Sequence, residues 1–182
     1  LKDVANEIYV AQPDLLDAML TDLKVHVKND PAVFDALTPY LFFKGFHGLQ
    51  AYRLANALWK KKRHHLALFI QSRMSEIFDM DIHPAATIEP GIMMDHATGI
   101  VIGETAIVES GVLFWHNVTL GGKGIEGRRH PLVRRGAKIG AHAILFGQIE
   151  IGENAVIAAG STVVKDIPAN SLITGPDATQ KR

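Results

Sequence analysis

Residues 133–164 read VRRGAKIGAHAILFGQIEIGENAVIAAGSTVV, and an aliphatic residue stands at every sixth position. These positions are Val133, Ile139, Leu145, Ile151, Ile157 and Val163. An α-helix repeats its apolar positions about every 3.6 residues and a strand about every 2 residues, so neither template fits. A period of six predicts short strands separated by turns, with one inward apolar side chain per strand.

The same spacing occurs earlier, in two series that a slip of two residues separates. Their members are Ile82, Ile88, Met94 and Ile100, then Ile102, Val108, Phe114 and Leu120. Small residues follow many inward positions four places later, namely Ala86, Thr98, Ala106, Ala137, Ala143, Ala155 and Ser161. Such residues fit the confined space beside a corner, and Gly103, Gly140 and Gly152 permit close turns. We therefore predict a parallel β-helix over residues 81–175.

Residues 1–80 show helical periodicity instead. Pro13 and Asp14 are typical of a helix start. The apolar stripe that we expect the following helix to bury consists of Leu15, Leu16, Met19, Leu23 and Val27. Further amphipathic patterns cover residues 44–62 and 64–78. The sequence thus predicts an α-helical N-terminal region that precedes the β-helix.

Composition excludes several classes of protein. The 182 residues are 47% hydrophobic, the formal net charge is zero, and there is no cysteine. A neutral chain is unlike most nucleic-acid-binding proteins, and the lack of cysteine excludes disulfides and thiolate chemistry. No apolar run reaches the roughly 18 residues of a membrane span, and LKDVANEIYV at the start is unlike a signal peptide. We therefore expect a cytoplasmic protein.

The repeat is interrupted once, by GGKGIEGRRHPL at residues 121–132. Glycine and charge dominate this stretch, so we expect an extruded, mobile loop, and loops on rigid scaffolds often carry binding residues. Residues 176–182 lack an apolar anchor, and we expect them to form a frayed tail.

The densest group of polar residues in the repeats is Met94-Asp95-His96-Ala97-Thr98-Gly99. A carboxylate beside an imidazole raises its basicity and fixes its tautomer, and imidazole is the usual general base at physiological pH. Asp81, at the edge of the first coil, is a second candidate partner for His96. The repeat histidines lack the short spacing of a zinc site, although stacked coils can bring distant residues together. Ordinary polar corners are the alternative interpretation.

Three strings carry a resemblance to a known family. DIHPAA, DHATG and GETA, followed by VTLGGKGIEGRRHP, are similar to serine acetyltransferases of the hexapeptide-repeat acyltransferase superfamily. The similarity runs from about residue 30 to about residue 164. Two residues of this chain depart from the family pattern. Lys123 stands where the family usually has a hydroxyl residue, and Arg128 stands where it commonly has an acidic residue.

The resemblance implies a left-handed β-helix, against the usual right-handed crossover rule. It implies a homotrimer or a hexamer, with active sites between neighbouring β-helices. The implied reaction transfers an acetyl group from acetyl-CoA to the hydroxyl of L-serine, which gives O-acetyl-L-serine for cysteine biosynthesis. Acetyl-CoA is then a co-substrate, and the implied mechanism needs no metal.

The resemblance also implies roles for individual residues. His96 is the general base, Asp81 orients it, and His130 assists from across the interface, where it can stabilise the oxyanion. For substrate and CoA, the implied contacts are Arg129 to the serine carboxylate, Asp30 and Asp95 to its ammonium, and Gly122, Ala141 and Ala159 along the CoA path. Small side chains there would let pantetheine lie close to the coil.

Three other functions compete with this interpretation. Another hexapeptide acetyltransferase could acetylate a sugar or drug hydroxyl, but it has no need of Asp30, Asp81 and the Arg129–His130 pair together. A hydratase of the γ-carbonic anhydrase type would need three zinc-binding histidines. A non-catalytic scaffold could bind cysteine synthase, although the isoleucine-ending tail that docks this partner is not seen in TGPDATQKR.

Overall fold

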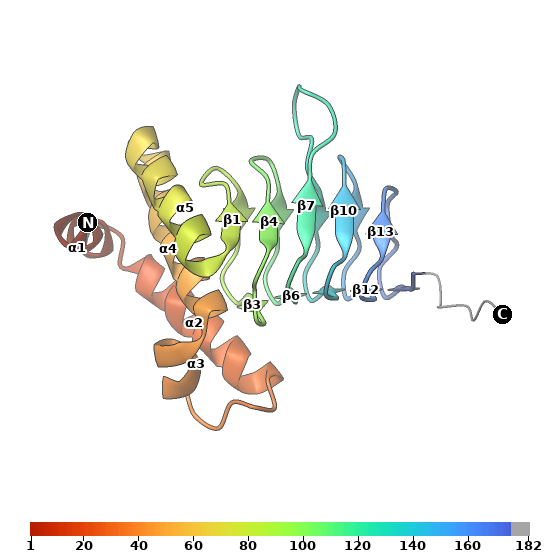
Figure 1. The fold of residues 1–182 in the computed structure, drawn as a ribbon, viewed down its shortest axis with the longest axis horizontal. Helices are drawn as coiled ribbons and strands as arrows, with labels where there is room; N and C mark the ends of the chain where they lie inside the picture. The colour runs from red at the N-terminus through yellow and green to blue at the C-terminus, as the bar shows by residue number, and fades with distance from the viewer. Residues whose placement is uncertain (176–182) are drawn as a thin grey trace.

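The computed structural model describes residues 1–175, and the predicted tail at 176–182 lies outside the described residues. An N-terminal region of helices leans against one end of a stack of strands (Figure 1). Its helices are α1 (Lys2–Ala11), α2 (Asp14–Asn29), α3 (Leu37–Phe42), α4 (Lys44–Lys60) and α5 (His64–Phe78).

Short strands follow from Met80 onward and fall into three parallel sheets, which form the three faces of a prism. The first face contains β1 (Met80–Ile82), β4 (Ile100–Ile102), β7 (Thr119–Gly121), β10 (Ile144–Phe146) and β13 (Thr162–Val163). The second contains β2 (Thr87–Ile88), β5 (Ile107–Val108), β8 (Leu132–Val133) and β11 (Glu150–Ile151). The third contains β3 (Met93–Met94), β6 (Leu113–Phe114), β9 (Lys138–Ile139), β12 (Val156–Ile157) and β14 (Leu172–Ile173).

The six-residue repeat sets the register of these sheets. Ile82 pairs with Ile102, and Ile102 pairs in turn with Leu120, so each coil places its aliphatic residue above that of the coil before. Every inward position that the sequence predicts is buried in one continuous apolar core. The predicted fold class, a left-handed parallel β-helix preceded by an α-helical region, is confirmed.

The two-residue slip has a structural cause at the corner between β3 and β4. Three residues there have positive φ, namely His96 (56°), Ala97 (59°) and Gly99 (71°). The equivalent corner of the next coil uses one such residue, Asn117 (56°). The left-handed region is costly for residues with a Cβ. The first coil therefore carries an enlarged, strained corner, and His96 lies on it.

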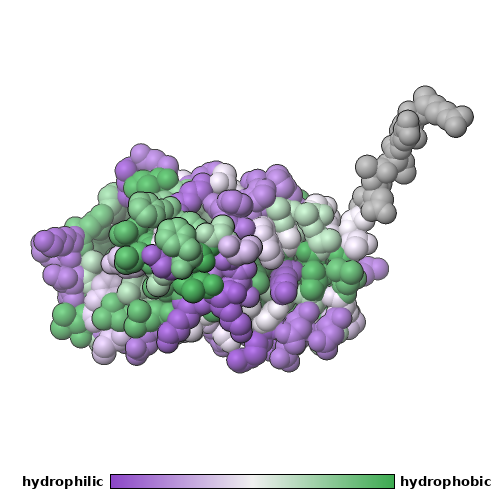
Figure 2. All heavy atoms as spheres, turned by 90° about the horizontal axis from the view of Figure 1, so that it is seen from below, coloured by the Kyte–Doolittle hydropathy of each residue, from purple (hydrophilic) through white to green (hydrophobic). Residues whose placement is uncertain are grey.

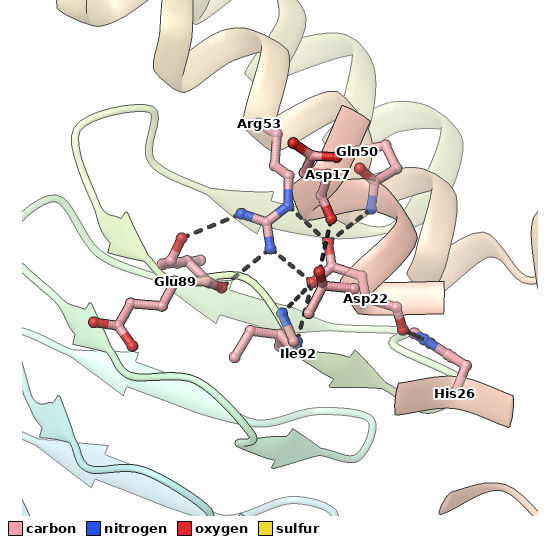
Figure 3. A network of polar contacts seen from close by, with 10 residues as sticks. Asp17, Asp22, His26, Gln50, Arg53, Glu89 and Ile92 are labelled. Atoms are coloured by element: carbon pink, nitrogen blue, oxygen red, sulfur yellow. Dashed lines mark hydrogen bonds and ion pairs between the residues drawn. The ribbon is translucent and has the colours of Figure 1, made fainter. Parts of the chain in front are cut away.

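The helical region is attached to the first coil by a buried ion pair, which Figure 3 shows. Asp22 of α2 is 0% exposed and Arg53 of α4 is 6% exposed, with Arg53 Nε 2.7 Å from Asp22 Oδ2. Asp22 Oδ1 also accepts hydrogen bonds from the backbone N–H groups of Gly91 (2.8 Å) and Ile92 (3.0 Å). Arg53 donates to the carbonyl oxygens of residues 88 and 89. Buried charges need such complete pairing.

The apolar stripe predicted for α2 is only partly buried, because Leu15, Met19 and Leu23 are half-buried. Leu16 and Val27 are exposed, and the buried residues of α2 are instead Ala18, Asp22 and His26. Asp22 faces polar backbone of the first coil, whereas the imidazole of His26 lies edge-on against Phe43 and Phe46. Hydrophobic periodicity cannot reveal a polar interface of this kind.

Apolar side chains gather on the outer surface of the helical end, as Figure 2 shows. The most exposed of them in and beside α3 are Phe34, Leu37, Leu41 and Phe42. The coil carries a more mixed surface in the same view. In residues 1–175, no helix is long and apolar enough to cross a membrane.

Candidate active site

A pocket of about 410 Å³ lies between the helical region and the enlarged corner of the first coil. Asp30, at the C-terminal end of α2, faces Asp95 and His96 of the corner across this pocket. The remaining wall comes from residues that include Phe42, Phe43 and Lys44, where α3 passes into α4. Asp30, which is distant in the sequence, therefore shares one cavity with the adjacent residues Asp95 and His96.

The imidazole of His96 is open to solvent, with 73% of its side chain exposed, whereas Asp95 is 21% exposed. His96 Nε2 lies 3.8 Å from Asp95 Oδ2, which is within ion-pair range but beyond a hydrogen bond. His116 of the next coil stands edge-on at a ring distance of 5.9 Å. His96 is thus held loosely and is accessible to a substrate.

His130 lies in a contrasting environment at the corner between the first and second faces. Its side chain is 7% exposed, and its Nδ1 meets the backbone N (3.2 Å) and the Oγ1 (2.9 Å) of Thr105. Burial lowers the pKa of His130, and the neighbouring Arg129 guanidinium lowers it further. A neutral, well-fixed imidazole is the result.

Arg129 forms an ion pair in this corner that the sequence analysis did not foresee. Its Nη2 lies 2.6 Å from Glu104 Oε2, and its backbone N–H donates to Thr105 Oγ1 at 2.9 Å. The hydrogen bond from Arg129 is the main reason that the pKa of Glu104 is lowered. The guanidinium is therefore held by Glu104 and remains 30% exposed toward solvent.

Asp81 lies at the centre of β1 and points outward. Its Oδ1 accepts a hydrogen bond from Gln71 Nε2 of α5 at 2.6 Å. Within residues 1–175, no hydrogen bond joins Asp81 to His96 in the same chain. The helical region, not the imidazole, therefore fixes the Asp81 carboxylate in the single chain.

The residues predicted to contact CoA lie in two separate places. Ala141 and Ala159 line one apolar cleft of about 340 Å³, together with Trp115 and Lys138. Gly122 lies instead at the His130 corner, where a Cβ would come within 2.7 Å of His130 Nε2. The structure thus brings Ala141 and Ala159 together but leaves Gly122 apart from them.

The predicted site residues form two groups at opposite ends of the first face. The His96 corner precedes strand β4, and the corner with Thr105 and His130 follows it. Asp30, Asp95 and His96 form the first group, and Arg129 and His130 form the second. Among the described residues, no hydrogen bond or ion pair connects the two groups.

The sequence analysis missed Glu104, Thr105 and Gln71. Glu104 and Thr105 lie in the string GETA, which was noted as a family feature, but neither residue was given a role. Gln71 lies in a helix without any motif, so no sequence signal pointed to it. In the part of the chain that the structure describes, no group of three or more His, Asp or Glu side chains is placed to hold a metal ion.

A parallel β-helix with an exposed imidazole beside carboxylates and a separate cleft of small residues defines the hexapeptide-repeat class of acyltransferases. Comparison with known proteins identifies the family. The model for the N-terminal region of serine acetyltransferase matches residues 1–51. A serine acetyltransferase of Buchnera aphidicola (subspecies Schizaphis graminum) is 46% identical over 178 residues, which is 97% of this chain and 68% of the relative.

Solved structures agree with this assignment. A serine acetyltransferase of Neisseria gonorrhoeae in complex with serine has a TM-score of 0.93 and 43% identity, over 98% of this chain and 73% of that one. The coenzyme A complex of the Brucella abortus enzyme has a TM-score of 0.93 and 43% identity, over 97% and 71%. The chain therefore belongs to the serine acetyltransferase family, as the sequence motifs predicted. It spans about two thirds of the length of the curated relatives that it matches.

Proposed function

We propose that this protein transfers the acetyl group of acetyl-CoA to the hydroxyl of L-serine and so makes O-acetyl-L-serine for cysteine biosynthesis in the cytoplasm. One observation carries the proposal: Asp30, Asp95 and His96 share a single pocket. A base beside two carboxylates suits a small amino acid, whose ammonium group needs anionic partners. The serine and coenzyme A complexes of the relatives support the same substrates.

His96 is the base in this mechanism. Its imidazole removes the proton of the serine hydroxyl as the oxygen attacks the thioester carbonyl. The tetrahedral intermediate then collapses, the carbon–sulfur bond breaks, and the CoA thiolate recovers the proton from the imidazolium. Proton transfer by a positioned base typically contributes about 10²- to 10⁴-fold to the rate. The wide exposure of His96 leaves its ring free to meet the hydroxyl.

The charged ends of serine are bound by the two separate groups of residues. Asp30 and Asp95 receive the ammonium, and Arg129 receives the carboxylate through its planar guanidinium. His130 donates a hydrogen bond to the oxyanion of the tetrahedral intermediate. Acetyl-CoA lies along the cleft of Ala141 and Ala159, where small side chains leave room for pantetheine.

We further propose that the two groups meet between neighbouring chains of a homotrimer, with the hexamer as the larger assembly. The first face, which separates them in one chain, carries exposed apolar side chains at Val101, Ile144 and Phe146. Burial of such surface favours association. Arg129, His130 and Asp81 of one chain would then complete the pocket of the next, with Asp81 orienting the neighbouring His96.

Mixing two inactive variants tests this arrangement. His96→Ala and His130→Ala should each be nearly inactive alone, because each damages every site. Co-expressed under different tags, they should form mixed trimers in which some interfaces carry both intact groups. Recovered activity in the doubly tagged fraction supports the shared site, and none above that of either variant would exclude it.

The acceptor is tested separately. Consumption of acetyl-CoA should be fast with L-serine and slow with sugars, aminoglycosides and D-serine. Equal rates with a sugar hydroxyl would show that the protein is another hexapeptide acetyltransferase.

A further inference from the structure

Thr105 has the most complete hydrogen bonding of the side chains around the second group of residues. It lies at the corner between β4 and β5, within the string GETA. Its Oγ1 accepts from the backbone N–H groups of Arg129 (2.9 Å) and His130 (3.2 Å) and meets His130 Nδ1 at 2.9 Å. A hydroxyl has one donor and two acceptor sites, so all three are used.

These contacts decide which nitrogen of His130 carries the proton. The backbone N–H of Thr105 points at Nδ1 at 3.2 Å, and an amide N–H can only donate. Nδ1 must therefore be the accepting nitrogen, and the Thr105 hydroxyl donates to it as well. Because burial keeps the pKa of His130 low, the ring is neutral and its single proton lies on Nε2.

The surroundings of Nε2 show where this N–H is directed. Nε2 lies over two glycines: a Cβ on Gly103 would come within 1.9 Å of it, and one on Gly122 within 2.7 Å. Any side chain at these positions would displace the ring. Within residues 1–175, Nε2 has no hydrogen-bond partner, so its proton is available to a substrate.

We propose that Thr105 is a positioning residue that holds His130 in the Nε2–H tautomer. His130 then acts as a hydrogen-bond donor to the substrate and not as a second base, because Nε2 has no lone pair to accept a proton. This assignment deepens the proposed function and rests on it for the identity of the substrate. It also assigns His96 as the base and His130 as the hydrogen-bond donor from their surroundings alone.

Nitrogen NMR of the intact protein tests the tautomer directly. With [¹⁵N]histidine labelling at pH 7.5, the His130 signals, assigned by their loss in His130→Gln, should show an unprotonated Nδ1 and a protonated Nε2. Thr105→Val removes the hydroxyl but keeps the backbone N–H, so it removes one of the two donors to Nδ1 and should raise the population of the Nδ1–H tautomer. Thr105→Ser should restore the wild-type pattern. Thr87→Val, an exposed strand threonine, is the matched control and should leave the His130 signals unchanged.

Kinetics then connect the tautomer with catalysis. Thr105→Val should lower kcat with serine by about 10- to 100-fold. This effect is larger than that of losing an ordinary hydrogen bond and smaller than that of losing an oxyanion donor. Thr105→Ser should recover most of the rate. The proposal is overturned if His130 of the wild type carries its proton on Nδ1, or if Thr105→Val keeps both the tautomer and kcat. A wild type with the expected tautomer but no serine acetylation would refute the proposed function and leave the Thr105 contact intact.

Discussion

The two histidine corners at the ends of the first face differ in how firmly they are built. At the His96 corner the backbone is enlarged and strained, and the imidazole stands in solvent with a loose carboxylate neighbour. At the His130 corner the ring is buried and fixed on one nitrogen by Thr105. A base must exchange protons and therefore needs access, whereas an oxyanion donor needs fixed geometry.

The corners also depend on different parts of the chain. The His130 corner belongs wholly to the β-helix, since Thr105, Glu104 and the loop residues all lie in its coils. The His96 corner needs the helical region, which supplies Asp30 and the Phe42–Phe43 wall. Damage to the helical region should therefore impair one corner and spare the other.

Removal of the His96 side chain should produce the largest effect. His96→Ala should lower kcat by about 10²- to 10⁴-fold, the usual contribution of a general base. The thermal unfolding midpoint should stay the same, because a side chain with 73% exposure leaves no cavity. His65→Ala, which removes an exposed histidine of α5, is the matched control and should keep full activity. A variant that retained half of the wild-type rate would refute His96 as the base.

Loss of the buried ion pair in the helical region should test whether the His96 corner can be impaired without a change at the His130 corner. Asp22→Ala leaves Arg53 unpaired in a buried position, which typically costs about 3–5 kcal/mol. We expect a lower unfolding midpoint and weaker serine binding, because Asp30 follows Asp22 on the same helix. The ¹⁵N signals of His130 should not change.

The double variant Asp22→Leu with Arg53→Met provides the control, since it removes both charges and should regain part of the lost stability. If Asp22→Ala shifted the ¹⁵N signals of His130 as well as weakening serine binding, the two corners would not be independent.

The β-helix was predictable because each coil repeats one simple requirement, an inward aliphatic residue every six positions. His96 could be singled out because it lies in the densest group of polar residues in the repeats and in the family string DHATG. Thr105 and Gln71 could not, because their roles depend on contacts across 25 and 10 positions that no periodicity encodes. The buried polar residues of α2 were missed for a related reason: Asp22 packs against backbone N–H groups of the first coil, and His26 is buried edge-on against Phe43 and Phe46.

Arg129→Ala should test the contribution of the His130 corner to serine binding. If the guanidinium binds the serine carboxylate, its loss should raise the KM for serine by about 10- to 100-fold, from roughly 1.5–3 kcal/mol for a charged hydrogen bond. The KM for acetyl-CoA should change much less. Arg129→Lys should recover only part of the affinity, because an ammonium lacks the planar fork. Weaker CoA binding with unchanged serine binding would instead identify Arg129 as a phosphate contact.

The smallest expected effect concerns pH and the buried His26, which lies behind the His96 corner. Burial lowers its pKa below the ordinary value of 6.5, although the charges of Asp22, Asp30 and Asp95 oppose this shift. The folded protein therefore binds this proton less readily than the unfolded chain. The resulting stability is present above about pH 6.5 and is lost as the pH falls from there toward the lowered pKa.

His26→Gln removes the titrating group and should flatten this dependence. Between pH 7.5 and 5.5, the wild type should lose up to about 1.4 kcal/mol more stability than the variant, since one pH unit of the window corresponds to about 1.4 kcal/mol per proton. Urea unfolding at both pH values measures the difference. His83 and His130 also have lowered pKa values and remain in both proteins, so their contribution cancels in the comparison. Parallel pH profiles for wild type and variant would show that His26 has the same pKa in the folded protein and in the unfolded chain.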